Sequence, residues 1–169
     1  VSVTCPISQD FKLEPEQLDK QLSNTDVKGL VLCSPSNPTG AVYSEQELTE
    51  LGEVLKKHED VSVLFDAIYD RIFYEDADFA PDLVDLVPEL ENRTLTFNGF
   101  SKTYAMTGWR LGYVIAETDT ADQLSKIQSH STSGANSFAQ HGAVEALKLD
   151  DSVIEDFREA FEKRRDIFV

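Results

Sequence analysis

Residues 29–66 read GLVLCSPSNPTGAVYSEQELTELGEVLKKHEDVSVLFD, and this stretch decides the fold. Its two ends, residues 29–33 and 61–65, are short and continuously apolar, as buried strands are. Between them, Ser44 is followed three residues later by Glu47, a capping box that predicts the start of an amphipathic helix. Apolar strands separated by a helix predict a parallel sheet that is covered by helices.

The same alternation continues on both sides of this stretch. Further strands are predicted at 95–97 and 111–115, and further helices at 15–22, 120–127, 136–147 and 152–169. The acidic, proline-containing stretch 76–88 is expected to be a surface excursion. We therefore predict an α/β fold, a three-layer α/β/α sandwich with a mostly parallel sheet, of which this chain holds an incomplete part.

The composition describes an acidic globular protein. Of its 169 residues, 41% are hydrophobic and 27% are charged, which is too apolar for a disordered chain. The sequence has 15 Lys and Arg residues and 31 Asp and Glu residues, so the formal net charge is -16. Such a surface repels phosphate backbones and anionic lipids, which argues against nucleic-acid and membrane partners. Two explanations stay open, a solvated acidic surface and adaptation to high salt, and stability measured against salt concentration separates them.

The two ends of the sequence predict a fragment. The one methionine is Met106 and residue 1 is a valine, whereas a complete reading frame normally begins with methionine. Residues 152–169 place apolar side chains at helical spacing and finish without a Gly or Pro stop signal. We expect a piece of a longer protein that ends inside a helix.

Polar side chains gather where the predicted strands end. Asn37 follows the first strand, Asp66 ends the next with Tyr69 three residues later, and Lys102 and Arg110 lie between the last two strands. Each has an ordinary explanation by itself, as a turn, a cap or a solvated charge. Ligands of open α/β sheets, however, bind at the carboxyl ends of the strands. Together these residues predict a site for an anionic ligand with a ring nitrogen and a reactive carbonyl.

Three motifs carry a resemblance to a known family. Residues 99–112, GFSKTYAMTGWRLG, resemble the pyridoxal-phosphate attachment signature of class I/II aminotransferases. Residues 37–40, NPTG, resemble the Asn-Pro element of that family, and residues 66–69, DAIY, resemble its Asp-x-x-Tyr element. The three motifs also occur in the family's order and at its separations.

The resemblance implies a role for each of the central residues. Lys102 is expected to form the Schiff base with pyridoxal 5'-phosphate and to carry the substrate's α-proton. Asp66 is expected to contact the pyridine nitrogen and keep it protonated. Asn37 and Tyr69 are expected to donate hydrogen bonds to the phenolic oxygen of the ring, and Asn37 also to approach the substrate carboxylate.

The phosphate of the cofactor is expected to be held by other residues. Arg110 offers a planar fork that matches a phosphate group, and Ser101 adds a hydroxyl, with simple packing as the alternative for that serine. Many family members also place a serine three residues before the lysine, where this sequence has Gly99. No metal site is expected, because the histidines of the sequence are isolated.

The family also implies an organisation for the whole protein. The chain resembles a fragment of the large domain of a fold-type-I aminotransferase, with residues 1–151 as the C-terminal portion of that domain. Residues 152–169 resemble the start of the connector helix that leads to a small domain outside this sequence. The parent is expected to be a cytoplasmic homodimer that acts on an α-amino acid and a 2-oxo acid. The isolated chain is expected to be weakly active or inactive.

Two other functions stay open at this stage. The same lysine and aspartate serve lyases and synthases of this fold, so another pyridoxal-phosphate enzyme is one alternative. A pyridoxal-phosphate-binding domain of a transcription regulator is the other, and the acidic charge argues mildly against it.

Overall fold

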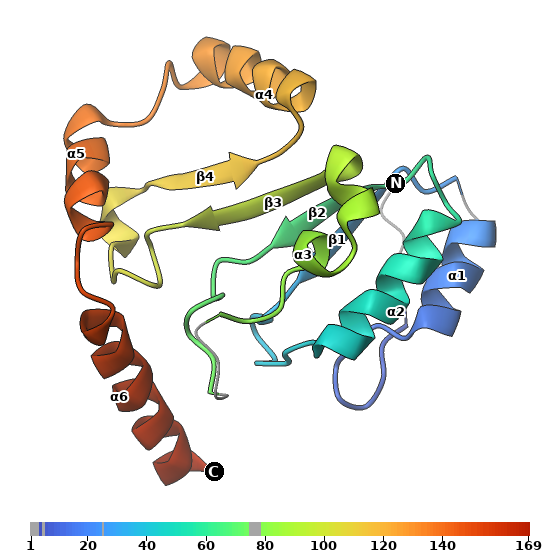
Figure 1. Ribbon diagram of the computed structural model, residues 1–169, viewed down its shortest axis with the longest axis horizontal. Helices are drawn as coiled ribbons and strands as arrows, with labels where there is room; N and C mark the ends of the chain where they lie inside the picture. The colour runs from blue at the N-terminus through green and yellow to red at the C-terminus, as the bar shows by residue number, and fades with distance from the viewer. Residues whose placement is uncertain (1–3, 5, 25, 75–78) are drawn as a thin grey trace.

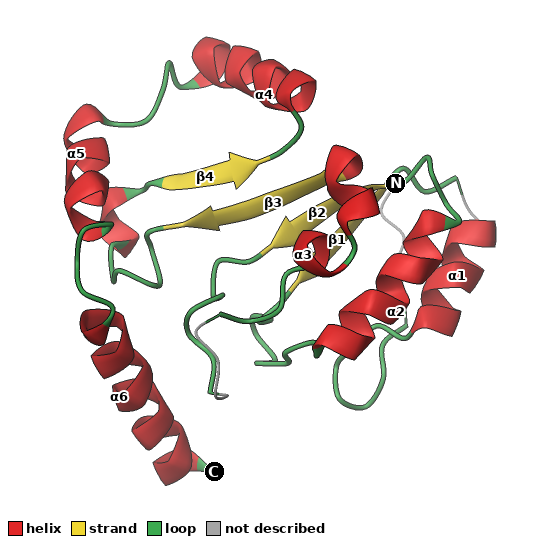
Figure 2. Cartoon of the chain, viewed as in Figure 1, coloured by secondary structure: helices red, strands yellow, loops and turns green. Residues whose placement is uncertain are grey.

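The protein is described here by a computed structural model that covers residues 4, 6–24, 26–74 and 79–169. Within these residues the strands form one four-stranded sheet in the order β1-β2-β3-β4 (Figure 2). The strands are β1 (Gly29–Cys33), β2 (Ser62–Asp66), β3 (Thr94–Gly99) and β4 (Gly112–Ile115). The first three run parallel and β4 pairs antiparallel with β3, which confirms the predicted α/β class with a mostly parallel sheet.

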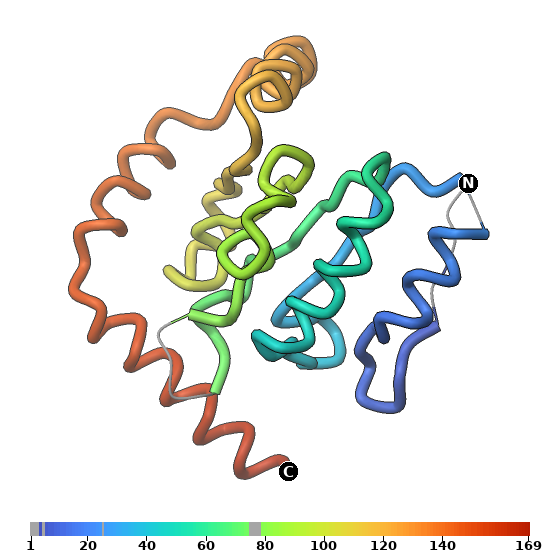
Figure 3. Tube along the Cα trace, turned by 45° about the vertical axis from the view of Figure 1, so that its right-hand side comes forward, coloured from blue at the N-terminus to red at the C-terminus, as the bar shows by residue number. Residues whose placement is uncertain are grey.

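Helices lie on both sides of this sheet. They are α1 (Pro15–Asn24), α2 (Glu45–Lys56), α3 (Leu83–Leu86), α4 (Thr118–Ser131), α5 (Ser137–Ala146) and α6 (Ser152–Phe168), with short 3-10 helices at Pro88–Arg93 and Thr107–Trp109. The helices α1, α2 and α3 pack together near one face of the sheet (Figure 1). The helices α4, α5 and α6 form an arc on the other side, away from α1 and α2 (Figure 3). This arc leaves part of the sheet uncovered, so the third layer is incomplete.

The strand register explains which face is covered. Val31 pairs with Leu64, and its neighbour Leu32 pairs with Phe65. Leu32 is 5% exposed and Phe65 is 1% exposed, whereas Val31 between them is 74% exposed. Because side chains alternate between the faces of a strand, the core lies on the α1–α2–α3 side of the sheet, and the opposite face is open.

The core is built from the leucine-rich face of α2. This helix begins with the predicted capping box. The Ser44 hydroxyl accepts a hydrogen bond from the Glu47 backbone N–H, and the Glu47 carboxylate accepts one from the Ser44 backbone N–H. Leu48, Leu51 and Leu55 then recur at helical spacing and are fully buried against the sheet. The helix start is therefore fixed by local hydrogen bonds, and its orientation by apolar burial.

The prediction that residues 76–88 form a surface excursion is wrong for the part that the structure describes. Residues 75–78 lie outside the described residues, but Leu83, Val87 and Leu90 are buried in the core beneath α2. Asp82 is the N-cap of α3, and its carboxylate accepts a hydrogen bond from the Val84 backbone N–H at 2.8 Å. The acidic residues between these positions face solvent while the apolar ones complete the core.

Candidate functional site

The carboxyl ends of β1, β2 and β3 meet at one edge of the sheet. Cys33 pairs with Asp66, and Asp66 pairs with Phe97, so the three strands end side by side. The segments that follow them line a cavity of about 800 Å³, and α6 forms another wall of it. Asn37, Tyr69, Ser101 and Lys102 all line this cavity, which is called the Lys102 cavity below.

Three of the predicted side chains are close together. The Asn37 amide donates to the Tyr69 hydroxyl at 3.4 Å, and the Lys102 Nζ atom lies 5.3 Å from the centre of the Tyr69 ring. These residues come from three loops that are far apart in the sequence. The fold therefore places an amine, a phenol and an amide around one space, as the motifs predict.

Asp66 lies at the same edge of the sheet but lines a different hollow. It is the last residue of β2, and with Ile68, Phe97 and Asn98 it lines a smaller hollow of about 340 Å³ on the open face of the sheet. One carboxylate oxygen accepts from the Ile68 backbone N–H at 3.1 Å. Asp66 does not line the Lys102 cavity, so its contact with a cofactor ring stays a prediction.

Arg110 is placed outside the cavity wall. Its backbone is left-handed, with φ 53° and ψ 50°, and its side chain is exposed. The guanidinium donates to the Thr107 carbonyl at 2.9 Å, and Thr107 itself lines the Lys102 cavity. The structure thus places the Arg110 side chain against Thr107 and outside the Lys102 cavity. The role of Arg110 in phosphate binding stays a prediction.

The segment that carries Lys102 is held by apolar contacts on both sides. Phe100 and Met106 are each 8% exposed and pack with Ala143 and Ala146 of α5. Between these anchors the chain turns tightly, and the Ala105 N–H donates to the Lys102 carbonyl at 3.1 Å. The lysine therefore sits on a short turn whose two ends are fixed by packing, which restricts where its amine can reach.

Gly99 is required by the contact between β3 and β4. It pairs with Gly112, and a Cβ atom at position 99 would lie 2.9 Å from the Gly112 Cα and 3.0 Å from the Leu111 carbonyl oxygen. Both neighbours are backbone and cannot rotate away. A serine side chain at position 99 would therefore press against backbone atoms in this structure.

We expect Gly99→Ser to lower the free energy of unfolding by about 1–3 kcal/mol, because the added side chain overpacks against backbone. Urea unfolding followed by circular dichroism measures the change. Gly108→Ser is the matched control, since a Cβ atom there meets nothing within 4 Å, and it should change stability by less than about 0.5 kcal/mol. Equal losses in the two variants would contradict this explanation.

The contribution of α6 to the Lys102 cavity was not predicted from the sequence. The helix was predicted, but not that Phe157, Phe161 and Arg164 line the Lys102 cavity. The spacing of four residues between the two phenylalanines was the available signal, since it places them on one face of the helix.

Two contacts hold α6 against the loop that follows β2. Arg71 forms an ion pair with Asp151 at the start of the helix, with an N–O distance of 2.8 Å. Nearer the end of the helix, the Arg165 guanidinium lies 4.6 Å from the centre of the Tyr74 ring. The helix is thus attached at both ends to the segment that carries Tyr69.

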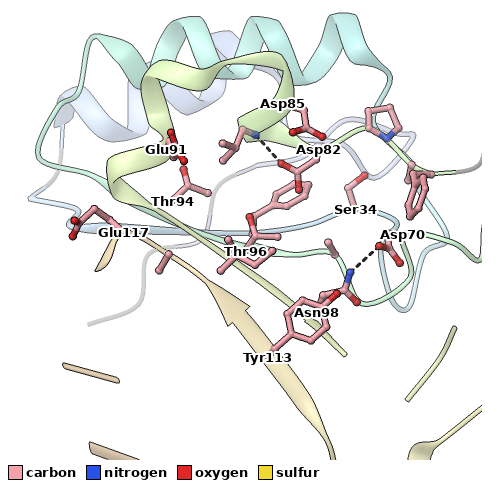
Figure 4. Close-up of a pocket in the computed structure, with 18 of the residues that line it drawn as sticks. Ser34, Asp70, Asp82, Asp85, Glu91, Thr94, Thr96, Asn98, Tyr113 and Glu117 are labelled. Atoms are coloured by element: carbon pink, nitrogen blue, oxygen red, sulfur yellow. Dashed lines mark hydrogen bonds between the residues drawn. The ribbon is translucent and has the colours of Figure 1, made fainter. Parts of the chain in front are cut away.

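A second cavity, of about 720 Å³, lies over β3 and β4 (Figure 4). Its charge is opposite to that of the Lys102 cavity, which is lined by Lys102 and Arg164. The charged lining residues of the second cavity are all acidic: Asp70, Asp82, Asp85, Glu91 and Glu117. Burial raises the pKa of Asp70, whose carboxylate accepts from the Asn98 amide at 2.7 Å, and burial also raises the pKa of Asp82. Among the residues that the structure describes, none of those lining the Lys102 cavity is acidic.

Several aminotransferases are similar to this chain in sequence and in fold. An aspartate/prephenate aminotransferase from Cereibacter sphaeroides is 43% identical over 169 residues, which cover 100% of this chain and 42% of that relative. The crystal structure of the aspartate aminotransferase from Rhizobium meliloti has a TM-score of 0.90 and 39% identity, with 99% of this chain and 41% of that one covered. An aromatic aminotransferase from Pyrococcus horikoshii has a TM-score of 0.88 and 34% identity, covering 98% and 44%.

These relatives agree with the match to the family as a whole. The profile of the family described as aminotransferase class I and II matches residues 1–169, which is the full length of the sequence. The match confirms the resemblance that the three motifs predicted. The chain is shorter than its relatives and spans 42% of the Cereibacter protein. We conclude that the chain belongs to the class I and II aminotransferase family.

Proposed function

We propose that the parent protein is an aminotransferase that moves an amino group between an α-amino acid and a 2-oxo acid, with Lys102 as its catalytic residue. The observation that carries this proposal is the placement of the Lys102 amine 5.3 Å from the Tyr69 ring, in the cavity that Asn37 also lines. A cofactor with an aldehyde and a ring oxygen needs an amine that reacts with the aldehyde. It also needs hydrogen-bond donors for the ring oxygen, which a phenol and an amide supply.

Pyridoxal phosphate is the cofactor of this family, and the Lys102 cavity fits it in size and in chemistry. A volume of about 800 Å³ lies in the usual range for cofactor sites. The lining includes an amine, a phenol, an amide and the hydroxyls of Ser101 and Thr107. These groups suit a ligand that is anionic, and the described lining residues include no carboxylate that would repel it.

The hydrogen bond between Asn37 and Tyr69 decides what the phenol can do. The Tyr69 oxygen accepts from the Asn37 amide, so the tyrosine proton stays available for a ring oxygen of the cofactor. Pyridoxal phosphate, when bound, supplies an aldehyde carbon that reacts with amines and a ring that accepts electrons. Lys102 is the nucleophile toward that carbon and carries the proton to and from the substrate's α-carbon.

The other predicted residues complete the proposal. Asp66 would hold the pyridine nitrogen protonated from the end of β2, which requires the ring to reach from the Lys102 cavity to the hollow that Asp66 lines. Asn37 would also donate a hydrogen bond to the substrate carboxylate. Ser101 and Arg110 bind the phosphate, with Ser101 already on the cavity wall. For Arg110, this role requires the guanidinium to turn away from the Thr107 carbonyl.

We also propose the organisation of the parent protein. Residues 1–151 belong to the large domain, and α6 begins a connector to a small domain, so the isolated chain is expected to be weakly active.

The exposed apolar side chains of Phe138, Val144 and Leu147 on and after α5 support further protein contacts, as in a homodimer. The acidic composition fits either a solvated acidic surface or a high-salt habitat, which stability measured against salt concentration separates, and we place the protein in the cytoplasm. In the described part of the chain, no helix has the length and apolar character needed to cross a membrane.

The experiment that tests this function is a half-reaction with the full-length parent loaded with pyridoxal phosphate. An added amino acid is expected to convert the cofactor to its amine form, which changes its absorbance, and to release an equal amount of 2-oxo acid. Addition of a 2-oxo acid should restore the original spectrum. A lyase or synthase would instead release other products without storing the amino group, and that result would contradict the proposal.

A further inference from the structure

The Lys102 amine and the Tyr69 ring belong to separate segments that leave the same edge of the sheet. Tyr69 follows β2 and Lys102 follows β3. The backbone pairing of these strands reaches as far as the Ala67 N–H, which donates to the Phe97 carbonyl at 2.9 Å. Beyond this pair, the distance between the amine and the ring depends on further contacts between the two segments.

One side-chain hydrogen bond joins the two segments just beyond the paired backbone. Asp70 directly follows Tyr69, and Asn98 lies four residues before Lys102. The Asn98 Nδ2 atom donates to the Asp70 carboxylate at 2.7 Å (Figure 4). A hydrogen bond to a charged acceptor is shorter and stronger than one between neutral groups. The segments are therefore connected by a directed bond close to both site residues.

The segment from Asn98 to Lys102 has little freedom to move. Both ends of the Asn98 amide are used, because its Oδ1 atom accepts from the Gly99 N–H at 2.7 Å while Nδ2 donates to Asp70. Of the three residues between Asn98 and Lys102, Gly99 and Phe100 are buried. Packed residues transmit a displacement, so a shift of Asn98 is expected to move the lysine.

Asp70 is the middle one of three residues that face different surroundings. Tyr69 lines the Lys102 cavity, Asp70 lines the second cavity, and Arg71 forms the ion pair with Asp151 at the start of α6. Burial raises the pKa of the Asp70 carboxyl group, and a half-buried carboxylate that loses its hydrogen-bond donor is costly. The bond from Asn98 thus holds the loop that carries both Tyr69 and the contact with α6.

We propose that Asp70 and Asn98 are positioning residues, whose hydrogen bond sets the distance between the Lys102 amine and the Tyr69 ring. The inference rests on the proposed function and adds to it two residues that act through others, since neither is among the described residues that line the Lys102 cavity. A displacement of about 1 Å can slow a reaction in a protein site strongly, so a loosened pair should react more slowly with an aldehyde. A purely structural role would lower stability without changing this geometry.

The geometry can be measured by NMR without a cofactor. The Lys102 Nζ atom lies 5.3 Å from the centre of the Tyr69 ring, so the methylene protons beside the amine are expected to carry a ring-current shift. Lys102→Arg identifies their signal, and Tyr69→Leu gives its position without the ring. We expect Asp70→Ala and Asn98→Ala to move the signal toward that position.

The rate of covalent capture of pyridoxal phosphate by Lys102 is the second measurement. Borohydride trapping followed by mass spectrometry should show a rate about three- to tenfold lower in Asp70→Ala and Asn98→Ala. Asp85→Ala is the matched control, because Asp85 is exposed and lines the same cavity as Asp70. This control should change neither the Lys102 signal nor the rate. Circular dichroism identifies the variants that are folded under the conditions used.

An exchange of the two side chains separates the hydrogen bond from the individual residues. In the double variant Asp70→Asn, Asn98→Asp, the new amide can donate to the new carboxylate, which can also accept from the Gly99 N–H. We expect this variant to restore the Lys102 signal and to capture the cofactor within about twofold of the original rate. Asn98→Asp alone brings two carboxylates together and should be impaired like the alanine variants.

Three results would overturn the positioning role. The first is that folded alanine variants are less stable in urea but keep the original Lys102 signal and capture rate. The second is an effect of Asp85→Ala as large as that of Asp70→Ala. The third is a folded exchange variant whose Lys102 signal stays displaced, and this variant decides the question where an alanine variant does not fold.

The same samples distinguish this inference from the proposed function. The Lys102 signal is recorded without a cofactor, whereas capture of pyridoxal phosphate tests the function. A chain that captures the cofactor equally fast in every variant contradicts the role of Asp70 and Asn98 alone. A chain whose Lys102 signal depends on their hydrogen bond but that captures no cofactor contradicts the proposed function.

Discussion

Replacing Lys102 with alanine is expected to abolish covalent binding of pyridoxal phosphate by this chain. The amine of Lys102 shares its cavity with Asn37 and Tyr69, and neither of these can form a bond to an aldehyde carbon. The remaining contacts are hydrogen bonds, so we expect the cofactor to bind at least about tenfold more weakly, a loss of ~1.4 kcal/mol or more. Titration of each protein with pyridoxal phosphate, followed by absorbance, measures both effects.

Two further variants test whether the effect belongs to the amine of Lys102. Lys102→Arg keeps the positive charge but has no nucleophilic amine at neutral pH, so covalent binding should be lost as in the alanine variant. Lys126→Ala removes an exposed lysine on α4 and should bind the cofactor like the unchanged chain. Covalent binding that survives in Lys102→Ala would show that another amine captures the cofactor.

Phe65→Ala is expected to cause the largest loss of stability. Phe65 is 1% exposed, belongs to the core cluster between the sheet and α2, and directly precedes Asp66. Truncation of a buried phenylalanine costs about 3–5 kcal/mol, because apolar burial is lost and a cavity remains. Small domains have only about 5–15 kcal/mol of stability in total, so this variant is expected to be partly or fully unfolded at moderate urea concentrations.

The control for this variant is Phe168→Ala at the end of α6. Phe168 is 89% exposed, so its removal should change the free energy of unfolding by less than about 0.5 kcal/mol. Urea unfolding followed by circular dichroism compares the two. Similar midpoints for both variants would mean that the sheet is not held by the core described here.

The parts of the fold that could be predicted depend on neighbouring residues. The capping box at Ser44 and Glu47 and the apolar run before Asp66 are short-range patterns, and the structure confirms the helix and the strand that they predict. The cavity at the strand ends also follows from sequence, because parallel strands bring Asn37, Tyr69 and Lys102 to one edge of the sheet.

The parts that were missed depend on packing between distant segments. Leu83, Val87 and Leu90 have the spacing of a buried helical face, but the acidic residues among them suggested a surface loop. The position of Asp66 on the open face, away from the Lys102 wall, follows from the alternation of side chains along β2 and could not be read from motif spacing alone. The contribution of α6 depends on the Arg71–Asp151 ion pair, which joins residues 80 positions apart.

The most direct test of the proposed site is to identify the amine that captures the cofactor. The unchanged chain is incubated with pyridoxal phosphate, treated with borohydride to make any carbon–nitrogen bond permanent, digested with a protease and mapped by mass spectrometry. We predict that the peptide containing Lys102 carries the cofactor at concentrations that leave Lys126 and Lys163 unmodified. Equal modification of these exposed lysines, or an unmodified Lys102, would contradict the assignment of the Lys102 cavity as the cofactor site.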